Sequence, residues 1–240
     1  MNRANKIYLS PAIKMVKNFL LDLIFPRFCL GCEKEIEIKQ TSQICDVCFG
    51  KIVLNRGVQY QDKSVLLGGG VLAAGRYEDP ILRGMILAFK YQSVGSLKTP
   101  LAELMINYLK KENLTDKFSG FVIAPIPLTL RRKLNRGFNQ SELLAKEIGV
   151  FLNCPVVNLL KRTKFNTPQV EIPDWQKRKE NISGVFCLSP AINIIDFGNL
   201  YDKVILIDDV STSGATLEEA AKVLKQAGAK EIYGFVAAKG

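Results

Sequence analysis

Residues 204 to 216 bring acids, hydroxyls and a glycine together directly after a short apolar run. The run covers residues 204 to 207, and two adjacent acids follow it, Asp208 and Asp209. The next residues are small: Ser211, Thr212, Ser213, Gly214, Ala215 and Thr216. Such a loop at the start of a helix offers backbone N–H groups and hydroxyls to a phosphate, and the helix dipole adds favourable potential. The sequence therefore predicts a phosphate-binding loop in which Gly214 lets the backbone approach its ligand.

The two acids in this segment are predicted to have a different task. Carboxylates at a strand end can accept hydrogen bonds from sugar hydroxyls or help to hold Mg2+. The segment is not a Walker A loop, because it lacks GxxxxGK and carries acids before the loop. An alternative is a plain helix start with Thr212 or Ser213 as its N-cap. Two acids, four hydroxyls and a glycine within nine residues exceed what a cap requires, which favours a binding site.

Four of the six cysteines form two CxxC pairs separated by twelve residues, Cys29 with Cys32 and Cys45 with Cys48. Each pair brings two thiolates to one side of a tight turn, and two such turns complete a tetrahedral shell that suits zinc. Gly31 fits the first turn if that turn needs a positive φ. Two disulfides or a redox pair are alternatives, but no secretion signal or thioredoxin-like context supports them. We expect a structural zinc site that contributes to the folding of a small module.

Composition limits the other chemistries that are open to this chain of 240 residues. It contains no histidine, which excludes Ser-His-Asp and Cys-His nucleophile pairs and HExxH metalloprotease helices. The formal net charge of +10 favours an anionic partner, such as nucleic acid, a phosphorylated ligand or an acidic membrane surface. With 48% apolar and 23% charged residues, the composition is typical of a folded globular protein.

Strand-like and helix-like segments alternate along the larger part of the chain. The apolar patterns predict strands at 71–77, 121–124, 204–207 and 232–237, and helices at 80–91, 97–111, 141–151 and 214–226. This alternation implies parallel βαβ units, so the predicted fold class is α/β with a parallel sheet. Ligands in such sheets bind beyond the carboxyl ends of the strands, where the loops after Ala124 and Ile207 would both lie.

The chain is predicted to have three parts. They are an amphipathic N-terminal helix within residues 1–24, a four-cysteine module at 25–55 and the α/β domain at 71–240. Residues 53 to 70 end in three glycines and are predicted to be a linker or hairpin. The N-terminal helix either packs on the body or touches a membrane surface. Charges interrupt its apolar stretch, so we expect no transmembrane span, and a cytoplasmic protein.

Positive charge is concentrated in residues 121 to 184, which carry a net charge of +6. We expect residues 131 to 136 to form a mobile loop beside the phosphate site, where an arginine such as Arg136 could clamp a pyrophosphate. Phe138 or Phe165 could stack on a base. The alternative is a solvated basic face. The basic residues of the segment that support the binding interpretation are Arg131, Arg132, Lys133, Arg136, Lys161, Arg162, Lys164, Lys177, Arg178 and Lys179.

The apolar strand with DDVSTSGAT at residues 208–216 resembles the phosphoribosyl pyrophosphate (PRPP) motif of type I phosphoribosyltransferases. The resemblance implies that Asp208 and Asp209 bind the ribose hydroxyls and that Ser211 to Thr216 bind the 5′-phosphate. It also implies that Pro125, Ile126 and Pro127 meet the pyrophosphate, which carries Mg2+. In an active enzyme a nitrogen nucleophile would displace pyrophosphate from C1, with Arg136 and both loops stabilising charge. No motif identifies the acceptor base.

The wider pattern resembles the ComF (ComFC) competence protein family, over nearly the whole chain. The motifs that carry it are the four cysteines, Tyr77, Phe89-Lys90-Tyr91, Pro125-Ile126-Pro127-Leu128, Arg136-Gly137-Phe138-Asn139-Gln140, Thr167-Pro168-Gln169, Arg178, Asn181 and DDVSTSGAT. The resemblance implies a zinc-binding module joined to a phosphoribosyltransferase-like domain. It also implies a role in handling single-stranded DNA during natural transformation, with a DNA-uptake helicase or channel protein as partner. The alternatives are an active phosphoribosyltransferase in nucleotide metabolism or salvage, and a regulator with PRPP as effector.

Overall fold

The computed structural model describes residues 27–36, 40, 42–58, 68–92, 94–163, 184–193, 195, 197 and 199–240. The predicted N-terminal helix lies outside the described residues. So do the predicted roles of Phe165, of residues 167–169, and of Arg178 and Asn181. Within the described ranges, no helix combines the length and apolar character that crossing a membrane requires.

The described elements alternate between helices and strands, as the sequence predicts. In chain order they are α2 (Asp46–Phe49), β1 (Gly68–Arg76), α3 (Pro80–Tyr91), η1 (Gly95–Leu97), α4 (Lys98–Lys111), η2 (Asp116–Phe118), β2 (Val122–Pro125), α5 (Leu130–Arg136), α6 (Gln140–Leu152), β3 (Leu160–Arg162), β4 (Phe186–Leu188), β5 (Lys203–Ser211), α8 (Ala215–Ala227) and β6 (Glu231–Lys239). The four predicted helices agree with α3, α4, α6 and α8 to within one residue at each end.

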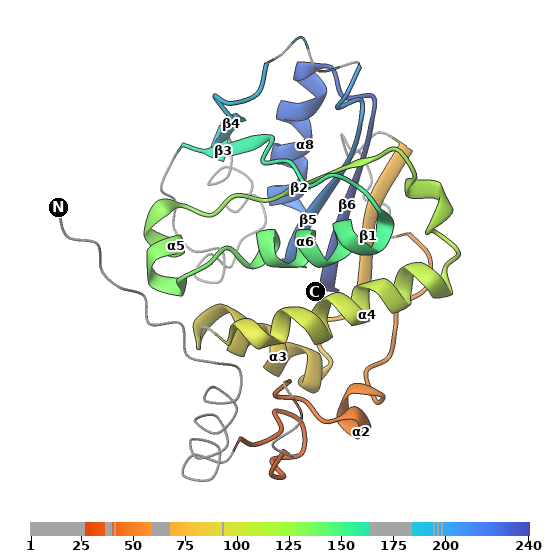
Figure 1. Ribbon diagram of the computed structural model, residues 1–240, viewed down its shortest axis with the longest axis vertical. Helices are drawn as coiled ribbons and strands as arrows, with labels where there is room; N and C mark the ends of the chain where they lie inside the picture. Colours follow the sequence, from red (N-terminus) through yellow and green to blue (C-terminus); the bar gives the residue numbers. More distant parts are fainter. Residues whose placement is uncertain are drawn as a thin grey trace, which may run out of the picture.

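Four strands form one parallel sheet in the order β1-β6-β5-β2 (Figure 1). Val204 of β5 is paired with Val122 on one side and with Ile232 on the other. All the carboxyl ends therefore lie at the same edge of the sheet. The predicted α/β class with a parallel sheet is confirmed. A separate antiparallel pair, β3 with β4, lies beside α8.

Alternate residues of each strand enter two different cores, because successive side chains point to opposite faces of a sheet. Ile205 and Ile207 of β5 pack in the core that contains α3, α4 and α6. Val204 and Leu206 pack in the core that contains α8. Both faces are covered, which explains why the strands are continuous apolar runs. Figure 1 shows α8 on one side of the sheet and α6 and α4 on the other.

The strands β1 and β5 extend furthest beyond their predicted ends. β5 continues through the two acids to Ser211, since Asp208 is paired with Val236 and Ser211 with Lys239 of the equally long β6. β1 begins at Gly68, so the three glycines are part of a strand and not of a linker. In both places pairing with β6 outweighs the local turn preference of the sequence.

The described residues 53 to 58 of the predicted linker or hairpin are hydrogen-bonded to the main domain. The backbone N–H of Asn55 donates to the Ala74 carbonyl at 2.9 Å, and its side-chain amide donates to the carbonyls of Ala73 and Gly75. The N–H of Gly57 donates to the carboxylate of Glu112 in α4 at 2.9 Å. This segment therefore covers the outer edge of β1, which would otherwise expose unpaired backbone groups.

The expected mobile loop at residues 131 to 136 is instead the helix α5. Thr129 is its N-cap and accepts a hydrogen bond from the Arg132 N–H at 3.3 Å, and Gly137 ends it with φ 76°. A capping threonine and a left-handed glycine are the usual ends of a helix, so the sequence did contain this signal. The basic residues of the segment are thus held on a helix at the side of the molecule (Figure 1).

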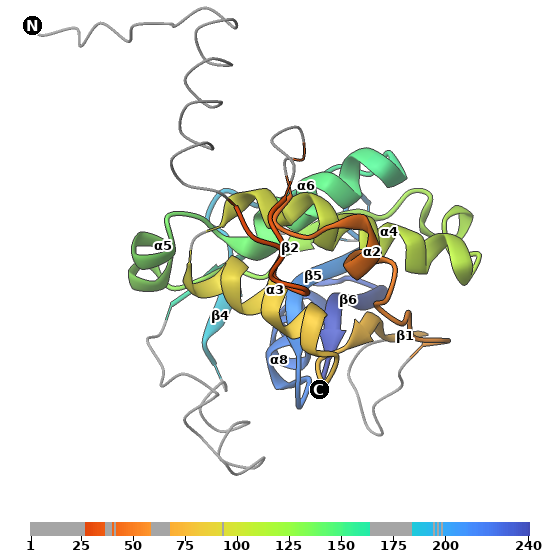
Figure 2. The same cartoon turned by 90° about the horizontal axis from the view of Figure 1, so that it is seen from below.

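The four-cysteine module is packed on the α/β domain. Ile44, Cys48 and Ile52 belong to the same continuous core as Leu82 and Met85 of α3. Seen from below, the segment that contains the cysteines crosses over α3 (Figure 2). The stability of the module is therefore coupled to that of the main domain.

Candidate functional site

The four predicted metal ligands meet in space. The Sγ atoms of Cys29, Cys32, Cys45 and Cys48 all lie within 4.8 Å of one another. A tetrahedron with metal–sulfur bonds of about 2.3 Å needs sulfur–sulfur distances of about 3.8 Å, so only small adjustments separate this cluster from a closed shell. The cluster fits a four-thiolate metal site, and the predicted four-cysteine module is confirmed.

The first turn of the module needs glycine for a different reason from the one predicted. Gly31 has no positive φ; within this turn the left-handed residue is Glu33, with φ 58°. A Cβ atom on Gly31 would lie 2.9 Å from both Cβ and Sγ of Cys48. Glycine is required because the two turns approach each other so closely.

Backbone donors stabilise the thiolate of Cys29. The N–H groups of Gly31 and Cys45 each point to its Sγ at 3.4 Å. Burial alone would raise the pKa of Cys29, but these and other backbone hydrogen bonds lower it to about 6. At neutral pH Cys29 is thus ready to bind a cation as a thiolate.

The acid pair lies at the carboxyl edge of the sheet, where β5 ends. Asp209 is 4% exposed, and its Oδ1 lies 2.9 Å from Nζ of Lys90 in the last turn of α3. The hydroxyl of Ser141 in α6 donates to Oδ1 of Asp208 at 2.8 Å. The helix α3 therefore holds Asp209 through an ion pair, and α6 holds Asp208 through a hydrogen bond.

The surroundings shift the pKa values of this cluster. Desolvation and the neighbouring Asp209 raise the pKa of Asp208 to about 6, although Lys90 and the Ser141 hydrogen bond oppose them. Burial acts to lower the pKa of Lys90, but the charges of Asp209 and Asp208 outweigh it and the pKa is raised. Lys90 therefore stays charged, and Asp208 is the group whose negative charge lacks full compensation. Such a carboxylate suits a cation or a hydroxyl donor.

The predicted phosphate loop runs from the end of β5 into α8. Ser211 is the last residue of β5, and Gly214 occupies the N-cap position with φ 76°. Gly214 and not Thr212 or Ser213 is therefore the N-cap residue, although the Ser213 hydroxyl accepts a hydrogen bond from the Ala215 N–H at 3.5 Å. The buried hydroxyl of Ser211 has no hydrogen-bond partner among the described residues. An orphaned polar group in this loop fits a site built for a ligand.

The predicted pyrophosphate loop lies next to β5. Pro125 ends β2, and the Ile126 N–H donates to the Ile207 carbonyl at 2.9 Å. The side-chain amide of Asn139 donates to the Ile126 carbonyl at 3.0 Å. The residues after β2 are thereby fixed beside the residues that precede the acid pair.

Arg136 also lies near the acid pair. Its Nη1 donates to Oε1 of Gln140 at 3.1 Å, and its guanidinium lies over the ring of Tyr91, which follows Lys90. Arg136 is close enough to Lys90 for its charge to affect the pKa of that lysine. The structure therefore brings together Asp208, Asp209, Arg136 and both loops. Their roles toward a ligand stay predictions.

Three residues of this cluster were not predicted to lie beside the acid pair. They are Lys90, Ser141 and Arg162, of which Arg162 lies in β3. Burial and the nearby Arg132 lower the pKa of Arg162 to about 10, and Asp208 acts in the opposite direction. All three come from elements far from residue 208 in the chain. The sequence signals for them were the motifs around Lys90 and Gln140 and the place of Arg162 in the basic segment.

Comparison with known proteins finds relatives that are named competence proteins or DNA utilization proteins. Over 217 residues the chain is 29% identical to Competence protein F of Haemophilus influenzae, covering 85% of this chain and 86% of that protein. It is 28% identical over 155 residues to the DNA utilization protein YhgH of Escherichia coli K12, covering 64% and 65%. Competence protein ComFC of Streptococcus pneumoniae is 29% identical over 138 residues, covering 56% and 54%. The second and third matches thus span less than two thirds of those relatives.

Two further comparisons contribute less. No protein-family model matches the chain. Among solved structures, a purine phosphoribosyltransferase from Pyrococcus horikoshii covers 58% of this chain and 86% of its own, at 20% identity and a TM-score of 0.31. The predicted resemblance is confirmed by the matched relatives, which are named Competence protein F, ComFC and YhgH, and by the four-cysteine cluster.

Proposed function

We propose that this protein binds PRPP or a related phosphoribosyl ligand at the carboxyl edge of its sheet. The observation that carries the proposal is the joining of the acid pair, the Ser211–Thr216 loop and the Pro125–Pro127 loop at the same edge. Sugar hydroxyls would donate to the carboxylates, and the 5′-phosphate would accept from the N–H groups that start α8. The unpartnered Ser211 hydroxyl supports a phosphate oxygen nearby.

Two metal ions belong to this proposal. The cysteine cluster would hold zinc, because four thiolates with sulfur atoms this close favour a soft tetrahedral cation. Mg2+ would enter with the pyrophosphate, and Asp208 is an oxygen ligand of the type that Mg2+ prefers. Bound Mg2+ would neutralise charge on the pyrophosphate. In this chain Lys90 and Arg136 would add positive charge beside it, and the two loops would orient the ribose.

We further propose that this binding serves the handling of single-stranded DNA during natural transformation, in the cytoplasm. Relatives named for competence and for DNA utilization support this proposal. The exposed cations of α5 offer phosphate contacts next to the site. A DNA-uptake helicase or channel protein is the partner that we propose for this role.

Isothermal titration calorimetry with PRPP and Mg2+ tests the ligand directly. We expect binding by the wild type and none by the Asp208→Asn/Asp209→Asn double variant. Asp202→Asn is the matched control, since this acid precedes β5 and pairs with Lys230 at 3.8 Å. Its binding should equal that of the wild type. Undetectable heat and no rise in Tm with PRPP for the wild type would overturn the proposal.

A second candidate is an active phosphoribosyltransferase of nucleotide metabolism or salvage. The position of Arg136 and Lys90 beside the acid pair favours it, because transfer requires charge stabilisation as pyrophosphate leaves. PRPP-dependent pyrophosphate release across a panel of purine and pyrimidine bases tests this candidate. Binding of PRPP without release for any base would instead favour a regulator that uses PRPP as effector.

A further inference from the structure

Tyr91 is an exposed aromatic residue next to the acid pair, and the phosphoribosyl site does not use it. It is the last residue of α3 and is 64% exposed, whereas Lys90 beside it is bound to Asp209. The guanidinium of Arg136 lies 5.3 Å from the centroid of its ring and covers one face. A ring that stays this exposed with one face covered presents its other face to solvent. It therefore offers a stacking surface for a planar ligand.

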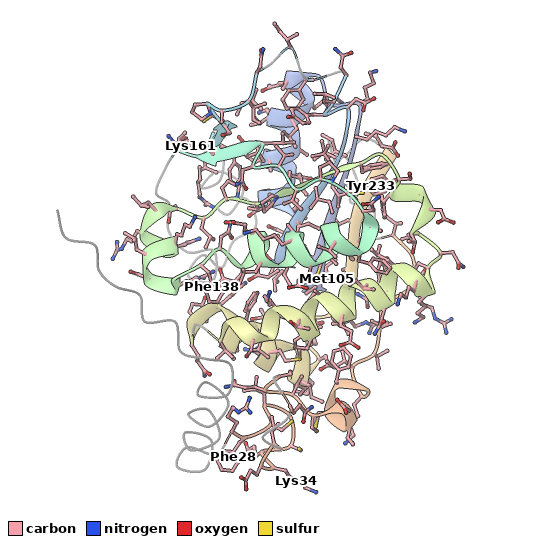
Figure 3. All side chains as sticks on the ribbon, in the orientation of Figure 1. Phe28, Lys34, Met105, Phe138, Lys161 and Tyr233 are labelled. Carbon is pink, nitrogen blue, oxygen red and sulfur yellow. The ribbon has the colours of Figure 1, made fainter. Side chains whose placement is uncertain are left out.

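Neighbouring residues hold this ring and guanidinium in place. Arg136 donates to Gln140, which is 1% exposed, and the amide of Gln140 donates to the Phe89 carbonyl at 3.1 Å. The rings of Phe89 and Phe138 lie 5.4 Å apart. Figure 3 shows Phe138 between the start of α6 and the layer of α3 and α4. A stacking surface that is fixed before binding loses little conformational entropy when a ligand arrives.

Two short chain connections tie Tyr91 and Arg136 to the acid pair. Lys90 precedes Tyr91 and contacts Asp209 at 2.9 Å. Ser141 follows Gln140, the partner of Arg136, and contacts Asp208 at 2.8 Å. Tyr91 and Arg136 are thus connected through Lys90 and Gln140 to the residues that contact the carboxylates, so a group attached to a sugar bound there would lie on their side of the site.

We propose that Tyr91 and Arg136 form a stacking platform for a nucleobase. The proposal rests on the proposed phosphoribosyl site, because the base would be the group next to the sugar. Stacking on an aromatic ring accepts every base, since every base has a π face. This agrees with the absence of a sequence motif for one acceptor. The base could be carried by a mononucleotide or by a single strand, for whose phosphates Arg131 and Lys133 on α5 are exposed.

The first test compares AMP with ribose 5-phosphate by calorimetry, so that the difference in affinity reports the base. We expect the wild type to bind AMP more tightly. Tyr91→Leu should lose about fivefold or more of AMP affinity and keep its affinity for ribose 5-phosphate. Tyr91→Phe should keep the preference, because it keeps the ring. Since Tyr91 is exposed, these variants should fold, and their Tm should equal that of the wild type.

The second test compares a labelled oligothymidylate of about ten nucleotides with an abasic strand of the same length, by fluorescence anisotropy. Both strands carry the same phosphates, so the difference again reports the bases. We expect Tyr91→Leu to reduce the difference in affinity between the two strands. The matched control is Phe151→Leu, because Lys110 lies over that ring at the same 5.3 Å. Phe151 is eleven residues along α6 from Gln140, about 17 Å away, and this variant should bind like the wild type.

Loss of the base preference in Tyr91→Leu supports the platform, and the test in which it occurs identifies the source of the base. A preference that Tyr91→Leu retains in both tests overturns the platform, as does the lack of any base preference in the wild type. Failure to bind PRPP and ribose 5-phosphate, together with a Tyr91-dependent preference for oligothymidylate, overturns the proposed phosphoribosyl function and leaves the platform standing.

Discussion

The cysteine module and the acid-pair site differ in how their parts come together. All four thiols lie within residues 29 to 48 and meet through two local turns. The acid pair depends on Lys90 from α3 and Ser141 from α6, which meet only because the sheet and its helices fold. The first site should therefore depend on its metal, and the second on the packing of the whole domain. Substitutions in each site can separate the dependence on metal from the dependence on domain packing.

The largest effect should follow removal of the metal that we propose for the cysteine module. A module this small depends on its metal, and Cys48 lies in the same core as α3. We expect Cys48→Ser, or treatment with a chelator, to lower the free energy of unfolding by several kcal/mol. Calorimetry measures the change in stability, and metal analysis measures the metal that stays bound.

The control for this prediction is Cys187→Ser, because Cys187 is a half-buried cysteine of β4 outside the cluster. It should keep one metal ion per chain and an unchanged Tm. Full removal of the metal with no change in Tm would contradict the coupling between the module and the main domain.

An intermediate effect should follow removal of the lysine at the acid pair. Lys90→Met leaves Asp209 buried beside Asp208 without its cation, and breaking a buried pair in this way costs about 3 to 5 kcal/mol. Lys98→Met is the matched control, since the Lys98–Glu147 pair is shorter, at 2.6 Å, but both side chains are at least one third exposed. It should cost at most about 1 kcal/mol. Urea unfolding measures both; equal losses would show that burial does not set the strength of the Lys90 pair.

The comparison also explains what the sequence could predict. The cysteine spacing is a local signal, and so are the helical patterns that agree with α3, α4, α6 and α8. The continuation of β5 to Ser211 was missed because it depends on the neighbouring β6. Lys90 and Ser141 were missed for the same reason: neither residue carries a local sign that it will face Asp208. A loop was expected in place of α5 because residues 131 to 136 follow the prolines that end β2, although Thr129 and Gly137 mark the ends of this helix.

The smallest effect should be a gain in stability, at Asp208. The fold raises its pKa from an ordinary value of 3.8 to about 6, so the folded state disfavours its ionised form. As pH rises, Asp208 loses its proton first in the unfolded chain. Its contribution to the free energy of unfolding therefore falls from about pH 4 to about pH 6, and above pH 6 the loss is constant. Asp208→Asn has no such titration and keeps an acceptor for the Ser141 hydroxyl.

At neutral pH we therefore expect Asp208→Asn to be more stable than the wild type by about 1 to 3 kcal/mol. The difference should shrink as pH falls from 6 to 4, which urea unfolding at several pH values measures. A difference that does not depend on pH would mean that the carboxylate of Asp208 is not destabilised by its surroundings. The same variant should lose PRPP binding, because the uncompensated charge that costs stability is the charge that the ligand and its cation would neutralise. A stabilising substitution that abolishes binding is typical of a functional site, whereas at the cysteine module the same atoms should serve both binding and stability.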